Sequence, residues 1–134
     1  MTDQYPDPET LLADWLHTRL DGCKMWADPI LPQPWEFTAP LGHVQAATGG
    51  AEIALTLDAA LIDVDFYAAK AEHARDYANR ARSELLLKLP GHTWPSGVTV
   101  SAVTTVTAPC WLPDPKVFKR SATYRVVFHG LTAG

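Results

Sequence analysis

The sequence contains few cysteines and no long apolar run. Its 134 residues include only Cys23 and Cys110, with no CxxC pair and no histidine at a ligand spacing. Neither a structural zinc site nor a disulfide framework is expected from this pattern. No stretch approaches the roughly 18 apolar residues of a membrane span, and residues 1–9 are polar and acidic, unlike a signal peptide. We therefore expect free thiols and a protein made in the cytoplasm without a membrane partner.

Charge is sparse, and its balance is wrong for binding phosphate backbones. Charged residues make up 19% of the chain, and 11 lysines and arginines against 15 acids give a formal net charge of -4. Binding to nucleic acid without sequence preference depends on cations that neutralise phosphates. A dedicated nucleic-acid-binding protein is therefore disfavoured.

Patterns typical of catalysis or metal binding are also missing. The five histidines are scattered, with no two at a ligating spacing. No glycine-rich loop precedes a helix as a phosphate site would, and no nucleophile-elbow pattern surrounds a serine or cysteine. Asp63 and Asp65 could ligate a divalent cation if further ligands converged on them, but the wet face of a strand looks the same. We expect no enzyme, no metal and no cofactor.

The chain does have enough apolar residues, 47%, to build a core, and its length allows one domain spanning residues 1–134. Asp7-Pro8-Glu9 combines a capping side chain, a first-turn proline and an acid, which predicts a helix over residues 8–21. Alanines and leucines at steps of three and four predict a longer helix over residues 68–89.

Runs of β-branched and aromatic residues predict about five strands. The first three should form an antiparallel meander and the last two should pair; they cover residues 41–47, 52–57, 61–67, 98–106 and 121–129. In the third strand Asp63 and Asp65 share one face, and Ile62, Val64 and Phe66 share the other. The predicted fold is α+β: a small, mostly antiparallel sheet packed by the alanine-rich helix, with an N-terminal helix and long Pro/Trp loops.

Proline and tryptophan concentrate in the two segments predicted to be long loops, residues 23–40 and 107–120. Trp26 and Trp35 lie in the first loop and Trp111 lies in the second. Aromatic residues on loops are typical of protein interfaces, but they also serve as core residues, and the sequence leaves both roles open. A small basic cluster near the second loop, typical by itself of a solvated loop, consists of Lys116, Lys119 and Arg120.

The order of elements and two motifs resemble the tail terminator proteins of long-tailed phages that infect actinobacteria. The first motif is DVDFYA at residues 63–68, before the alanine-rich helix. The second is WLPDP at residues 111–115, followed by KRSATYRVVF at residues 119–128. The similarity spans most of the chain, although residues 119–121 depart from the family's shorter lead into the last strand.

The resemblance implies a virion protein that forms a ring of six on the head-proximal end of the tail tube. Such a ring stops tube growth, and its partners are itself, the tail tube protein and the head–tail connector. DNA only passes through its lumen, where the negative charge of Asp63 and Asp65 would limit sticking. The residues expected to contact ring neighbours or the tube are Trp26, Trp35, Trp111, Asp114, Lys116, Lys119 and Arg120.

Two other functions stay open. A head-completion or other neck connector protein would share this composition, and the position of its gene relative to the tail tube gene would separate the two. A small metal-dependent nuclease that uses Asp63 and Asp65 ranks third, and it predicts thermal stabilisation by metal.

Overall fold

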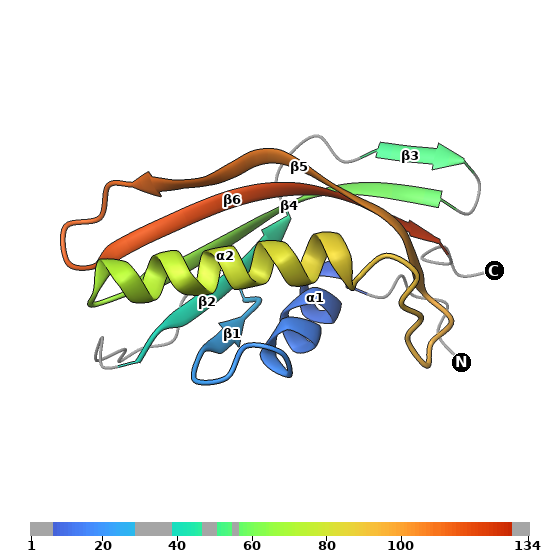
Figure 1. Ribbon diagram of the computed structural model, residues 1–134. Coiled ribbons are helices and arrows are strands. Elements are labelled where there is room, and N and C mark those ends of the chain that lie inside the picture. The colour runs from blue at the N-terminus through green and yellow to red at the C-terminus, as the bar shows by residue number, and fades with distance from the viewer. Residues whose placement is uncertain (1–6, 29–38, 47–50, 55–56, 130–134) are drawn as a thin grey trace.

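The computed structural model describes residues 7–28, 39–46, 51–54 and 57–129 (Figure 1). Within these ranges two helices pack against one sheet of six strands. The fold is therefore α+β, as predicted. The elements in chain order are α1 (Pro8–His17), β1 (Lys24–Trp26), β2 (Leu41–Ala46), β3 (Ala51–Ala54), β4 (Leu57–Ala68), α2 (Ala71–Leu87), β5 (Thr99–Leu112) and β6 (Phe118–His129).

The sheet has the strand order β1-β2-β4-β6-β5, and β3 also pairs with β4. Its pairing is mixed: β1 runs parallel to β2, whereas the other four pairs are antiparallel.

The predicted meander of three strands is wrong. Both β2 and β3 pair with β4, and the predicted turn at residues 58–60 lies inside β4. Asp58 and the two following alanines have low β propensity, but pairing with Glu52 on one side and Phe128 on the other compensates for it.

Both helices form near their predicted positions but are shorter. Asp7 caps α1, because its Oδ1 accepts a hydrogen bond from the Glu9 N–H at 3.0 Å. The helix ends at His17 rather than residue 21. The predicted second helix began at Ala68. In the structure Ala68 belongs to β4, where it lies opposite Phe118 of β6. No helix in the described ranges is long and apolar enough to cross a membrane.

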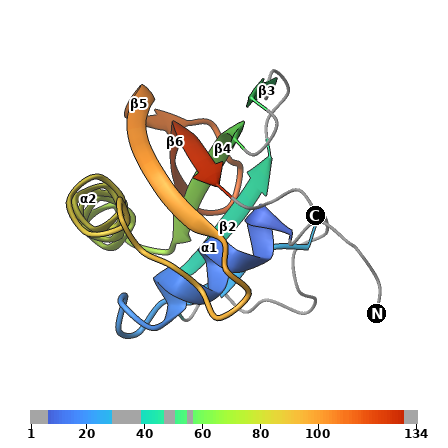
Figure 2. The ribbon, with the colours of Figure 1, turned by 90° about the vertical axis from the view of Figure 1, so that its right-hand side faces the viewer.

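The core lies between the helices and the sheet, with α2 beside β4 and β6 and α1 beside β2 (Figure 2). The alternation predicted for the third strand is correct: Ile62, Val64 and Phe66 are buried in this core. The Phe66 ring stacks on Tyr77 of α2, with centroids 6.3 Å apart. Alanine-rich α2 therefore covers the apolar face of β4, as the sequence predicted.

The second predicted long loop, residues 107–120, is largely strand. β5 continues to Leu112 and β6 begins at Phe118, so residues 113–117 form the connection. Pro109 lies within β5, which tolerates it because an edge strand needs hydrogen-bond donors on one side only. The first predicted loop, residues 23–40, contains the short β1, whereas residues 29–38, Trp35 included, lie outside the described residues.

Candidate protein interface at the β5–β6 tip

Two of the five exposed large apolar side chains in the described ranges, Trp111 and Phe118, meet at the tip of the β5–β6 hairpin. Trp111 is 41% exposed and Phe118 is 48% exposed, whereas Leu112, also 41% exposed, lies opposite Lys119 and alternates to the other face of the hairpin. Single exposed apolar residues are normal on a protein surface, but a contiguous group marks an interaction site. The hairpin tip is therefore the candidate functional surface of this chain.

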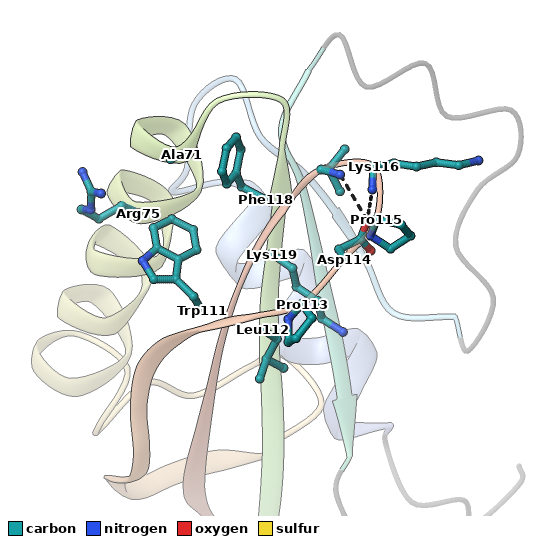
Figure 3. Close-up of a pocket in the computed structure, with 11 residues that line it drawn as sticks. Ala71, Arg75, Trp111, Leu112, Pro113, Asp114, Pro115, Lys116, Phe118 and Lys119 are labelled. Carbon is teal, nitrogen blue, oxygen red and sulfur yellow. Dashed lines mark hydrogen bonds between the residues drawn. The ribbon is translucent and has the colours of Figure 1, made fainter.

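These side chains line a groove of about 600 Å³, which we call the tip groove. Residues 111–119 of the hairpin form most of it, and Ala71 and Arg75 of α2 complete it (Figure 3). Its lining combines apolar side chains with the cations of Arg75 and Lys116, and it includes Lys119, whose ammonium pairs with Asp65. This combination favours a protein partner with both apolar and acidic groups.

Trp111 is held in place by the hairpin itself. It lies opposite Arg120 in the β5–β6 register, and its ring meets that of Phe118 at a centroid distance of 6.1 Å. Figure 3 shows the indole beside Phe118, with Arg75 of α2 next to it. The sequence left open whether Trp111 is a core or an interface residue. Its exposure is that of a surface residue supported on one side.

Two guanidinium groups lie against the Trp111 ring. The Arg120 carbon Cζ is 4.7 Å from the ring centroid and that of Arg75 is 5.7 Å away. Neither arginine makes an ion pair within the described part of the chain, and the buried Arg120 Nε has no hydrogen-bond partner there. Guanidinium groups next to an aromatic ring are well suited to bind a carboxylate from a partner.

Asp114 builds the turn at the hairpin tip. Its Oδ1 accepts hydrogen bonds from the backbone N–H groups of Lys116 at 2.9 Å and Val117 at 3.1 Å. These bonds shape the connection between the strands and leave the Lys116 side chain exposed. Asp114, predicted as an interface residue, thus uses one carboxylate oxygen inside the turn.

The structure divides the predicted basic cluster between the two faces of the sheet. Arg120 points to the α2 side with Trp111, whereas its neighbour Lys119 alternates to the other side. There the Lys119 Nζ lies 3.8 Å from Asp65 Oδ2 and 5.2 Å from the Tyr67 ring centroid. One of the three predicted cations is therefore already paired within the subunit.

The two aspartates expected in the ring lumen make internal contacts. Asp63 Oδ1 accepts a 2.5 Å hydrogen bond from Thr123 Oγ1. Asp65 is 9% exposed, and this burial raises its pKa above the ordinary value, although Ser121 and Lys119 act in the opposite direction. No group of three or more metal-ligating side chains occurs in the described residues. The lumen role of Asp63 and Asp65 stays a prediction.

Trp26, predicted as an interface residue, is half-buried in edge strand β1, where the Lys24 ammonium lies 5.7 Å from its ring centroid. Sequence reasoning missed Arg75, Leu112 and Phe118. Arg75 is an ordinary exposed position of a helix, and only the tertiary fold brings it to Trp111.

No protein-family model matches the chain, and a search of curated proteins finds no match.

Proposed function

We propose that the protein is a structural tail protein of a long-tailed phage. Six copies form a ring on the head-proximal end of the tail tube, stop its polymerisation and present a docking face to the head connector. The observation that carries this proposal is the tip groove, where exposed Trp111 and Phe118 lie beside Arg75 and Arg120, neither of which makes an ion pair with a residue that the structure describes. Such a surface suits a protein neighbour.

The placement of the two family-like motifs supports the proposal. Residues 63–68 form the end of β4 and residues 111–115 form the end of β5 and the start of the tip. Although far apart in sequence, they meet through β6: Tyr67 pairs with Lys119, which in turn pairs with Leu112. Both motifs therefore contribute to one end of the molecule, the end that carries the tip groove.

The arrangement of the sheet also suits a ring. A closed ring needs two different contact surfaces on each subunit, because neighbours meet head to tail. The small α+β body, with its mostly antiparallel sheet, offers different elements at its two edges: long β5 at one and short β1 with α1 at the other. In the proposed virion the ring's other partners are the tail tube protein and the connector, and DNA passes through the lumen.

Disabling the gene in the genome that encodes the protein tests this function. Electron microscopy of the released particles should show tails of uncontrolled length without heads, and the wild-type gene supplied in trans should restore normal particles. Tails of normal length beside unattached heads would instead identify a neck connector protein. Intact particles would overturn a role in the virion and return attention to Asp63 and Asp65.

A further inference from the structure

The two edges of the sheet carry charge of opposite sign. The tip groove together with Arg120 has four cations, of which Lys119 is already paired with Asp65 at 3.8 Å, and one acid, Asp114 of the turn. The α1–β1 edge, residues 7–28, has five acids and two cations. Of those two cations, Arg19 is already paired with Glu84, at 3.3 Å.

Three carboxylates of the α1–β1 edge are available to a partner. Asp14 on α1, Asp21 after α1 and Asp28 after β1 are exposed. Their side chains make no hydrogen bond or ion pair with any residue that the structure describes. Edge strand β1 adds the half-buried Trp26 to the same side of the molecule.

One subunit cannot bring these surfaces together. β1 and β5 are the two ends of the strand order, and Figure 1 shows β5 along the top of the sheet and β1 with α1 at the bottom. A contact between them must join two copies. Because the surfaces differ, the contact is head to tail, and its repetition by rotation closes a ring.

We propose that the tip groove of one copy docks on the α1–β1 edge of the next copy. Arg75 and Lys116 then face carboxylates of the neighbour, and Trp111 is covered. This contact deepens the proposed ring function and rests on it. A second copy is the occupant that the charges favour, since each subunit carries both the basic groove and the complementary acidic edge.

A charge-swap experiment tests the contact. The groove variant carries Arg75→Glu and Lys116→Glu; the edge variant carries Asp14→Lys, Asp21→Lys and Asp28→Lys. All five side chains are exposed, so both variants should keep the wild-type melting temperature within a few degrees. In the groove variant both contact surfaces are acidic, and in the edge variant both are basic. Each variant alone therefore places like charges at every head-to-tail contact and should stay monomeric. An equimolar mixture pairs opposite charges at every contact and should assemble into rings of alternating subunits.

Sedimentation velocity and native mass spectrometry measure the outcome at matched protein concentrations. A mixture that associates no more than its separate variants overturns the contact, and so does either variant alone associating as strongly as wild type. The matched control, Arg80→Glu with Lys88→Glu, reverses the same number of charges on and just after α2, outside the groove. It should associate like wild type.

The charge-swap experiment and the gene disruption can fail independently of each other. If disruption gives headless tails of uncontrolled length but the mixture fails to assemble, the ring stands and this contact is wrong. If disruption leaves particles intact while the mixture assembles, the head-to-tail contact stands and the phage role is wrong.

Discussion

The Arg120 guanidinium lies 4.7 Å from the centre of the Trp111 ring, directly across the β5–β6 pairing. Strand register therefore sets the contact, and Arg75 approaches the same ring from α2. The indole is held in one orientation while 41% of the residue stays exposed. A side chain that is ordered before binding loses little conformational entropy when a partner covers it, which suits Trp111 as an interface anchor.

Trp111→Ala should therefore weaken association much more than folding. The half-exposed ring loses two cation–π contacts of about 0.5–1 kcal/mol each and its contact with the Phe118 ring, so we expect the free energy of unfolding to fall by about 2–3 kcal/mol. Urea unfolding and sedimentation velocity of the same preparation measure the two effects. The control is Trp15→Ala, which removes a 5% exposed core ring and should cost about 3–5 kcal/mol. A Trp111→Ala protein as unstable as this control would make Trp111 a core residue.

Gly22 permits the tight turn between α1 and β1. Its φ is +80°, and a Cβ there would lie 2.8 Å from the Tyr77 hydroxyl, which donates a hydrogen bond to the Asp21 carbonyl. Gly22→Ala should therefore destabilise the fold by about 2 kcal/mol, through backbone strain and the clash together. Thermal or urea unfolding measures the loss.

Gly97→Ala is the matched control for this prediction. Gly97 also has a positive φ, +93°, but a Cβ there meets nothing within 4 Å. It should lose only the backbone contribution of about 1 kcal/mol. If both alanine variants lose the same stability, the Tyr77 hydroxyl makes no steric contribution. Adding Tyr77→Phe to each background should also shrink the difference between them.

Much of the local structure follows from local signals. The Asp7 cap, the alanine pattern of α2 and the alternation in β4 each depend on neighbouring residues, and the structure contains all three. The parallel pairing of β1 with β2 depends on residues 17 apart, Lys24 and Leu41, and has no local signature. Strand order therefore could not be predicted from periodicity.

The candidate site was partly predictable for the same reason. Trp111 stood out among prolines, but those prolines also made residues 107–120 look like a loop. An edge strand accommodates Pro109 because its outer side has no pairing partner in the described sheet. Arg75 reaches Trp111 only because α2 packs across β4, β5 and β6, a relationship that no spacing in the sequence encodes.

The two free thiols should differ strongly in reactivity. Cys23 is 3% exposed, and burial raises the pKa of its thiol to about 12, so it holds almost no reactive thiolate at pH 8. Cys110 is only half-buried, on β5. A disulfide reagent at pH 8 should therefore titrate one thiol rapidly in the folded protein and two after unfolding. Cys110→Ser should remove the rapid phase, and a rapid phase that survives this substitution would contradict the burial of Cys23.

Asp65 should make the protein less stable as pH rises. Burial raises its folded-state pKa above the ordinary 3.8, so the folded state holds the proton more tightly than the unfolded chain. Stability is then lost as pH rises from 3.8 through the folded-state pKa. The asparagine in the Asp65→Asn variant cannot ionise. The free energy of unfolding of the variant minus that of wild type should therefore rise over that pH window and level off above it. Urea unfolding between pH 3.5 and 7 measures the difference, with Asp76→Asn on exposed α2 as the control for losing a carboxylate. A difference that falls as pH rises would mean that the Lys119 ion pair outweighs the cost of burying Asp65.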